Sequence, residues 1–277
     1  MDLSNENVVH VKKGGFEYLQ FRRLLKYSDT ISHAYCLGLD RNFRTGRADG
    51  EKISEDEYLK AISDYEGFCN CINLDYKNIV KTKQAHTDHI EIINKKINVD
   101  APDLDVYQKI DGLITDKKDL VLSTTNADCI LLILFDPVKK AIANVHSGWK
   151  GTVQRISVKA VKKMQEQYDC NAENIICCMC PSIRKCHFEV DREVYEIFYN
   201  EFKDLEQFCD IIEKNLQEEK WYIDTVEINR MILKNAGLLE SNIIDSKLCS
   251  VCNKDYMHSF RVEKEGYGLS TAVVGLI

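Results

Sequence analysis

The feature that most constrains the fold is a run of six consecutive apolar residues, Ile130 to Phe135. A run of this length is too apolar for a surface helix and far too short to cross a bilayer, which takes about 20 residues. It therefore predicts a buried strand. Similar short apolar runs predict further strands at Leu120 to Leu122, Ala141 to Val145, Ile175 to Met179 and Leu269 to Ile277.

Four segments between these runs have the residue spacing of amphipathic helices. The first begins at a capping box, in which Ser54 and Glu57 satisfy backbone N–H groups of the first turn. The four expected helices cover residues 54–69, 153–168, 191–202 and 224–237.

Strands and helices are mixed without strict alternation. The pattern therefore favours an α+β fold of packed mixed β-sheets flanked by helices over a doubly wound parallel fold. Only three prolines occur, and no Gly/Ser-rich linker interrupts the chain. We therefore expect residues 1–277 to form a single domain.

Charge and composition exclude several classes of partner. The formal net charge is −7, which argues against bulk binding of nucleic acid or an anionic membrane surface. The first residues, Met1 to Glu6, lack the charged and then apolar pattern of a signal peptide. We therefore expect a cytoplasmic location with reduced cysteines. Nothing in the sequence points to a protein partner.

Reactive side chains interrupt or follow the apolar runs at three places. Cys129 ends the polar segment between two expected strands, another expected strand ends at His146, and His86 follows a β-branched stretch. Sheets hold strand ends in place, so these side chains can converge. One thiolate and two imidazoles suit tetrahedral zinc, and three protein ligands leave the open position of a catalytic site. Taken singly, a histidine at a strand end is more often a hydrogen-bonded core residue, and a cysteine is more often a small buried apolar residue.

The remaining cysteines contain a second pattern that resembles a zinc motif. Cys177-x-x-Cys180 and Cys249-x-x-Cys252 can be combined into a four-cysteine site. Residues three apart in a strand point to opposite faces, however, so Cys177 and Cys180 cannot share a metal without a bulge. The sequence therefore predicts free thiols at these four positions and about one zinc per chain.

The segments that carry these residues resemble one protein family in order and spacing. Gln84-Ala85-His86 matches its Q-x-H motif, Thr125 to Cys129 matches T-x-A-D-C, and His146 to Gly151 matches H-x-G-W-(R/K)-G. Asp111 to Thr115 matches its D-(G/A)-L-(I/V)-T motif, and segments at Pro181 to Ile183, Cys186 to Val190 and His258 to Arg261 look like further family elements. The family was first described as polyphenol oxidases or multicopper laccases. It is now regarded as zinc-dependent purine nucleoside phosphorylases with a YfiH-like fold.

The resemblance implies a zinc enzyme with His86, Cys129 and His146 as ligands. It implies phosphorolysis of adenosine, inosine and methylthioadenosine to the free base and ribose 1-phosphate, with adenosine deamination as a second activity. Purine nucleosides and phosphate are then the partners. Open-site zinc lowers the pKa of water, which suits attack on C6 of the purine. Copper can replace zinc in vitro at such a site.

Two carboxylates are candidates for the catalytic proton carrier in the implied reaction. Asp128 precedes the proposed cysteine ligand, and Glu189 lies in a later matching segment. Asp128 is equally suited to orienting His146 or His86 through a hydrogen bond.

Candidates for binding phosphate or the substrate are Gln84, Lys150 and Arg261, although the two cations also fit solvated surface positions. Two departures from the family pattern bear on this. The chain has Leu37 to Arg41 where the family has T-R-x-G-G, and Tyr267-Gly268-Leu269 where it has T-G-R. Neither family arginine can be assigned here.

Three alternative functions make different demands on the sequence. Multicopper oxidation needs many histidines, usually in H-x-H pairs, whereas this chain has seven histidines and no such pair. A Cys/His amide hydrolase would use Cys129 as nucleophile and His146 or His86 as general base. A non-catalytic zinc-binding protein would hold metal without turning over a nucleoside.

Overall fold

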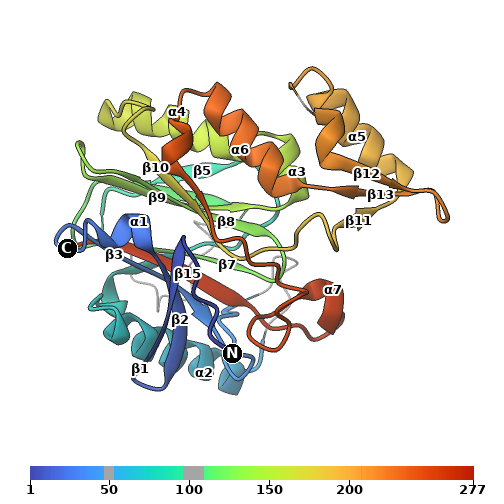
Figure 1. The fold of residues 1–277 in the computed structure, drawn as a ribbon. Coiled ribbons are helices and arrows are strands. Elements are labelled where there is room, and N and C mark those ends of the chain that lie inside the picture. Colours follow the sequence, from blue (N-terminus) through green and yellow to red (C-terminus); the bar gives the residue numbers. More distant parts are fainter. Residues whose placement is uncertain (47–52, 96–108, 207) are drawn as a thin grey trace.

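Two six-stranded sheets lie face to face in the computed structural model, which describes residues 1–46, 53–95, 109–206 and 208–277 (Figure 1). The first sheet has, in spatial order, the strands β1 (Val8–Lys13), β2 (Phe16–Phe21), β3 (Ile31–Leu37), β15 (Ser270–Leu276), β7 (Val121–Asn126) and β4 (Ile79–Lys81). The second has β14 (Ile243–Asp245), β10 (Ile176–Met179), β8 (Ile130–Asp136), β9 (Ala141–Ser147), β6 (Gly112–Thr115) and β5 (Ile90–Ile92).

Both large sheets are mixed, as expected. Most neighbouring strands are antiparallel, but β4 runs parallel to β7, β5 to β6 and β14 to β10. A third, smaller sheet has the order β11 (Glu189–Val190), β13 (Lys220–Ile223) and β12 (Ile212–Asn215). The expected α+β class with packed mixed sheets is therefore confirmed.

The apolar run from Ile130 to Phe135 forms strand β8, as predicted. Leu131, Ile133 and Phe135 pack between the two sheets, and the alternate residues Ile130, Leu132 and Leu134 pack on the opposite face of the second sheet. A strand covered on both faces has no polar side, which explains a run without alternation. The other four strand predictions are confirmed by β7, β9, β10 and β15.

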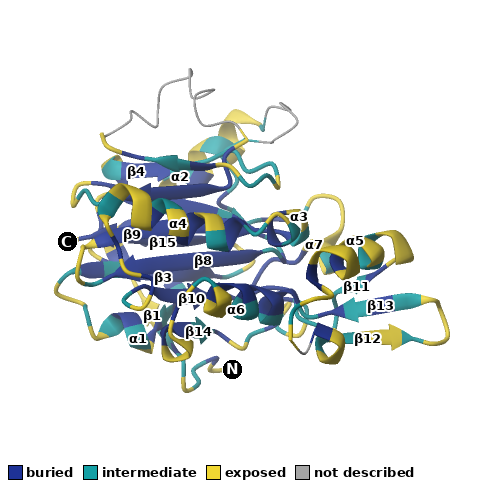
Figure 2. Cartoon of the chain, turned by 90° about the horizontal axis from the view of Figure 1, so that it is seen from above, coloured by how far each residue is buried: buried dark blue, intermediate teal, exposed yellow. Residues whose placement is uncertain are grey.

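Helices cover the outer faces of the two large sheets. Helix α2 packs on the first sheet, α4 and α6 pack on the second, and α5 packs on the small third sheet (Figure 1). Figure 2 shows the central strands of both large sheets as buried, with exposed residues on the outer helices. The helices are α1 (Arg22–Leu25), α2 (Glu55–Cys71), α3 (Trp149–Val153), α4 (Ile156–Tyr168), α5 (Arg192–Phe202), α6 (Thr225–Asn235) and α7 (Phe260–Glu263). Short 3-10 turns lie at η1 (Tyr76–Asn78), η3 (Phe208–Ile211) and η4 (Glu240–Asn242).

The expected helix starts and stops are mostly confirmed. Ser54 and Glu57 form the capping box of α2, and the side chain of Asp224 accepts from the backbone of Glu227 at the start of α6. The single helix expected over 153–168 is wrong at its start. Arg155 has a left-handed φ of 57°, so it separates α3 from α4.

Several strands were not expected from the sequence, among them the first three. Strands β1 and β2 form an antiparallel hairpin in which polar residues occupy the more exposed positions. Such half-polar strands lack the apolar runs that identify buried strands. Among the helices of the described ranges, none has both the length and the apolar character needed to span a membrane.

A buried amide joins the two large sheets. Asn144 on β9 donates from Nδ2 to the carbonyl of Leu122 on β7, at 3.0 Å, and to that of Ala272 on β15, at 2.8 Å. Its Oδ1 accepts from the hydroxyl of Thr124. The side chain is fully buried, so water cannot replace these bonds.

We expect Asn144→Ala to lower the free energy of unfolding by about 2–4 kcal/mol, because it leaves two buried carbonyls and a hydroxyl without their partner. Urea unfolding measures the change as a lower midpoint at unchanged slope. Asn200→Ala, on the exposed face of α5, is the matched control. Equal midpoints for the two variants would contradict the bridging role of Asn144.

Candidate functional site

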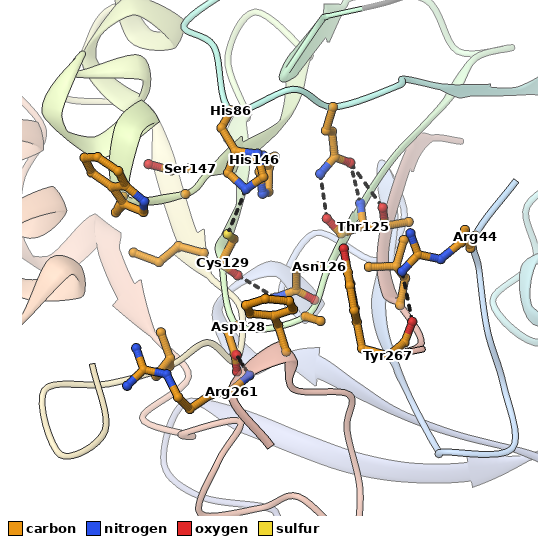
Figure 3. Close-up of a pocket in the computed structure, with 18 of the residues that line it drawn as sticks. Arg44, His86, Thr125, Asn126, Asp128, Cys129, His146, Ser147, Arg261 and Tyr267 are labelled. Atoms are coloured by element: carbon orange, nitrogen blue, oxygen red, sulfur yellow. Dashed lines mark hydrogen bonds between the residues drawn. The ribbon is translucent and has the colours of Figure 1, made fainter. Parts of the chain in front are cut away.

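Three side chains from distant parts of the chain meet beside one pocket (Figure 3). His86 lies between β4 and β5, Cys129 lies in the turn from β7 to β8, and His146 lies near the end of β9. The Sγ of Cys129 is 3.7 Å from the Nε2 of His86, and the three potential ligand atoms all lie within 4.8 Å of one another. The structure therefore places the three predicted metal ligands together.

Strand topology explains this meeting. Strand β7 belongs to the first sheet and β8 to the second, so the turn that ends at Cys129 carries the chain from one sheet to the other. Leu131 pairs with His146, and Ile130 pairs with Ser147, which brings Cys129 beside the end of β9. The sequence order of the motifs does not show this register, which is a property of the folded sheet.

The carboxylate of Asp111 holds both histidines. It lies just before β6 and accepts from Nδ1 of His146 at 2.8 Å, which leaves Nε2 of that ring for a ligand. It also accepts from the backbone N–H of His86 at 3.1 Å and from the backbone N–H and hydroxyl of Thr87 at 2.8 and 2.7 Å. Asp111 was identified from the sequence only as part of a motif, without a role.

Close approach and unusual backbone geometry mark the same place. His86 and Asp128 adopt left-handed φ values of 58° and 86°, which non-glycine residues rarely do and which often occur at functional sites. Gly148 lies against the metal-ligand candidates. A Cβ at this position would lie 2.6 Å from Cδ2 of His86 and 3.1 Å from Sγ of Cys129, so only glycine fits.

Electrostatics in the metal-free site favour an ion pair. Burial alone would raise the pKa of Cys129, but the neighbouring His146 and His86 outweigh it and lower that pKa to about 6. Burial alone would lower the pKa of His146, yet Cys129 and Asp111 raise it to about 10. Against burial, hydrogen bonds from His146 and Thr87 lower the pKa of Asp111 to about 2.

The donor set fits zinc. Sulfur at about 2.3 Å and nitrogen at about 2.0 Å from a tetrahedral zinc lie about 3.5 Å apart. This is close to the 3.7 Å between Sγ of Cys129 and Nε2 of His86. His146 is buried, Cys129 is partly exposed and His86 is exposed, so the group is open on one side. Only two of the seven histidines are present in this group, which does not fit a multicopper cluster.

The pocket beside this group has a volume of about 580 Å³, within the usual range for small-ligand sites. Aromatic side chains form part of its wall. Phe260 is 53% exposed, although it is a large apolar residue. Its ring packs edge to face against that of Tyr267, with 5.1 Å between the ring centroids. The pocket therefore combines a metal-ligand group with aromatic surface that water can reach.

Four of the five other predicted site residues line this pocket, namely Gln84, Asp128, Glu189 and Arg261. Lys150 differs. It is exposed on α3, its Nζ lies 5.5 Å from the ring centroid of Trp149, and it is not among the described residues that line the pocket. Helix α3 begins at Trp149 and directs Lys150 outward, which a linear motif does not reveal.

Asp128 is engaged in holding the pocket wall. Its carboxylate accepts from the hydroxyl of Ser250 at 2.5 Å and from the backbone N–H of Arg261 at 2.7 Å. The suggestion that Asp128 orients His146 or His86 is therefore wrong, because Asp111 does this for both.

The remaining predicted polar residues also have partners within the protein. Both ends of the Gln84 amide bond the backbone of Thr125, at 2.7 and 2.8 Å. The guanidinium of Arg261 donates to the carbonyls of His187 and Glu189 at 2.9 and 3.1 Å. Hydrogen bonds from Tyr222, Asn215 and Lys220 lower the pKa of Glu189, so its carboxylate is ionised.

Sequence reasoning missed a cation that also lines the pocket. Arg44 donates to the carbonyl of Tyr267 at 2.9 Å, and its guanidinium lies 4.5 Å from the centroid of the Tyr267 ring (Figure 3). Tyr267 belongs to the segment that replaces the family's T-G-R. Arg44 therefore brings a positive charge beside the place where an arginine is missing, and no sequence motif links the two segments.

Comparisons with known proteins agree with the motifs. A family described as Multi-copper polyphenol oxidoreductase laccase matches residues 49–277. Purine nucleoside phosphorylase LACC1 from Mus musculus is 26% identical over 84% of this chain and 50% of its own length, so the chain spans about half of that relative. Adenosine deaminase RL5, from an unknown prokaryotic organism, is 31% identical over 69% of this chain and 72% of its own length. The crystal structure of the Bacillus licheniformis hypothetical protein YfiH has a TM-score of 0.78 at 22% identity, over 94% of this chain and 96% of that one.

In the metal-free protein, we expect alkylation of Cys129 to reach half of its maximal rate near pH 6. The thiolate is the reactive form, so the rate falls below this pH as the sulfur is protonated and is constant above it. Mass spectrometry of the Cys129 peptide measures the rate, and Cys129→Ser gives the background from other thiols. A half-maximum near the ordinary value of 9.0 would contradict the ion pair.

We expect Asp111→Asn to lower the apparent zinc affinity roughly tenfold to a hundredfold, because the amide cannot accept all the bonds that orient His146 and His86. Competition with a chromogenic chelator measures the affinity, and circular dichroism checks the fold. Asp119→Asn, at an exposed position before β7, is the control. Unchanged affinity in a folded Asp111→Asn protein would exclude this orienting role.

Proposed function

The chain belongs to the family described as Multi-copper polyphenol oxidoreductase laccase, and we propose that it is a zinc-dependent purine nucleoside phosphorylase with adenosine deaminase activity. The observation that carries the proposal is the convergence of His86, Cys129 and His146 beside a pocket of about 580 Å³. The names of the relatives support it, since they include a purine nucleoside phosphorylase and an adenosine deaminase.

In this proposal His86, Cys129 and His146 hold the zinc. When bound, zinc supplies a Lewis acid that lowers the pKa of water and polarises substrate oxygens. Asp111 keeps the His146 ring oriented with Nε2 toward the site, and it fixes the backbone that carries His86. The strained conformation of His86 is maintained by these bonds, because the Asp111 carboxylate bonds three consecutive N–H groups, those of Ala85, His86 and Thr87.

The purine base binds against the aromatic wall. Phe260 and Tyr267 offer ring faces and edges that water reaches, and stacking a purine there removes apolar surface from water. Phe188 and Trp149 also line the pocket. A flat heterocycle therefore fits the chemistry of the wall better than an extended peptide does.

Phosphate binds to Arg44 on the pocket wall. Arg44 keeps one bond to the carbonyl of Tyr267, and its other N–H donors serve a phosphate oxygen by charge-assisted bonds. Arg261 is primarily a bracing residue, since two of its nitrogens bond the carbonyls of His187 and Glu189. In phosphorolysis a phosphate oxygen forms a bond to C1′ as the bond from C1′ to the base nitrogen breaks, and the base leaves with a proton.

The proton carrier is Glu189 rather than Asp128. Glu189 lines the pocket and is ionised, so it can accept a proton from the attacking group and return it to the leaving base. Both oxygens of Asp128 accept short bonds, at 2.5 Å from Ser250 and 2.7 Å from Arg261, whereas those of Glu189 accept longer bonds, at 3.3 Å, from Asn215 and Lys220. In deamination the same carboxylate transfers the proton from attacking water to the departing ammonia.

A second candidate function is favoured by one observation. Cys129, His146 and Asp111 are linked in space as the thiol, imidazole and carboxylate of a cysteine hydrolase triad are. In addition, the pKa of the Cys129 thiol is lowered to about 6. This amide-hydrolase function needs no metal. It predicts rapid alkylation of Cys129 in the protein as purified, whereas a zinc-bound sulfur is protected until a chelator is added.

The proposal is tested by following adenosine, inosine, adenine and hypoxanthine chromatographically at several phosphate concentrations. We expect Arg44→Gln to raise the KM for phosphate roughly tenfold to a hundredfold, since a charge-assisted bond contributes about 1.5–3 kcal/mol. Deamination needs no phosphate and should change little. Arg261→Gln should slow both reactions, because the wall that carries Glu189 loses the hydrogen bond from Arg261 to the Glu189 carbonyl.

Two further variants make this test discriminating. His86→Ala should abolish both reactions, and Arg192→Gln, exposed on α5, is the control that should change neither. An unchanged phosphate dependence in Arg44→Gln would exclude Arg44 as the phosphate ligand. If the zinc-loaded protein consumes no purine nucleoside and Cys129 alkylates freely, the amide-hydrolase function replaces the proposed one.

A further inference from the structure

A second group of potential metal ligands lies outside the pocket described above. Cys186 and His187 lie in the turn between β10 and β11, and Cys249 and Cys252 lie in the loop between β14 and α7. Their ligand atoms all lie within 4.8 Å of one another. These four residues form the loop-cysteine group.

Separations within the loop-cysteine group match tetrahedral zinc. Two sulfurs at about 2.3 Å from one zinc lie about 3.8 Å apart, and sulfur and nitrogen lie about 3.5 Å apart. The Sγ of Cys186 is 3.6 Å from that of Cys249 and 3.9 Å from that of Cys252. The Nδ1 of His187 is 3.6 Å from the sulfurs of both Cys249 and Cys252 and 3.1 Å from that of Cys186.

The sequence suggested only Cys177 and Cys180 as partners of Cys249 and Cys252, and it predicted free thiols at all four positions. Cys177 packs between the second sheet and its helices, and Cys180 packs between the two sheets, so these two thiols lie on opposite faces, as expected for residues three apart in a strand. The structure instead joins the C-x-x-C pair to the adjacent Cys186 and His187. Tertiary folding thus completes a ligand set that sequence spacing did not identify.

Neither core packing nor a disulfide accounts for the loop-cysteine group. Burial in a core does not fit, because Cys186 and Cys252 are exposed. A disulfide needs sulfurs about 2.05 Å apart, far less than the separations here, and all twelve cysteines are unpaired. Three thiols and an imidazole on two irregular loops are the donor set of closed, structural zinc sites.

We propose that Cys186, His187, Cys249 and Cys252 bind a second zinc ion, which is structural and has no open position for substrate. This site is separate from the one proposed for catalysis, where three ligands face a pocket. It raises the expected content from about one to about two zinc ions per chain.

The proposed zinc joins the two loops that support the pocket wall. Ser250, between the two ligands of the C-x-x-C pair, donates to Asp128 at 2.5 Å. The carbonyl of His187 accepts from the guanidinium of Arg261 at 2.9 Å, and Ser182 and Cys249 form an isolated β-bridge. Losing the metal removes a direct link between the two loops, so the second zinc stabilises the wall that carries Asp128, Glu189 and Arg261.

Counting zinc in variants tests the proposal. By elemental analysis, we expect about two zinc ions per chain in the natural protein and in the Cys209→Ser control, an exposed cysteine outside both groups. The double variant Cys249→Ser with Cys252→Ser and the single variant Cys129→Ala should each retain one. Zinc that is lost only in Cys129→Ala would overturn the second site and leave the proposed function standing. Zinc that is lost only in the double variant would overturn the metal site of the proposed function and leave the second site standing.

Thiol protection in the natural protein provides a measurement that does not depend on whether a variant folds. Cys186 and Cys252 should resist alkylation until a chelator is added, whereas the exposed Cys209 should react at once. Peptide mass spectrometry reads all three sites in one sample. Equal rates at Cys186, Cys252 and Cys209 in the untreated protein, or a disulfide within the loop-cysteine group, would overturn the proposal.

Discussion

The arrangement of the site depends on one carboxylate. Asp111 is fully buried and accepts hydrogen bonds from the His146 ring and from the backbone around His86. A buried carboxylate is stable only when its oxygens accept hydrogen bonds. Removing any one of these donors therefore destabilises the whole arrangement, including the bonds to the other donors. Two histidines from segments far apart in the chain are thereby held at one place, with Nε2 of His146 directed to the site. The position of Cys129 then follows from the pairing of β8 with β9.

The boundary between the two large sheets explains why the pocket forms where it does. The chain crosses from one sheet to the other between Asn126 and Ile130, and a crossing turn cannot complete the ladder of either sheet. Asn126 satisfies this turn by donating to the carbonyls of Cys129 and Pro181. Irregular backbone held in this way carries the reactive thiol, while the apolar strands behind it provide a rigid floor.

The pocket wall opposite the metal-ligand group is built differently. It consists of loops and the small third sheet. The third sheet packs with α5 on an apolar core of its own, whereas the loops are joined by polar bonds of Asp128, Arg261 and Ser250. Polar bonds of this kind hold the loops less firmly than an apolar core holds a sheet. The loop-cysteine group lies where these loops meet, so the two candidate zinc sites have complementary tasks, one at the floor of the pocket and one behind its wall.

The sequence by itself determined many of the elements and named the candidate ligands. The spaced motifs pointed to His86, Cys129 and His146, and the binding of a metal by these three residues stays a prediction. Apolar runs identified β7, β8, β9, β10 and β15, and capping residues identified α2 and α6. Periodicity and local capping are properties of neighbouring residues, which is why these predictions succeeded. Only the tertiary structure decided the long-range pairings. It assigned the orienting role to Asp111, turned Lys150 outward, brought Arg44 to Tyr267 and joined Cys249 and Cys252 to Cys186 and His187. Each of these depends on strand register or loop placement, because residues that meet across a fold leave no mark in the spacing of either segment.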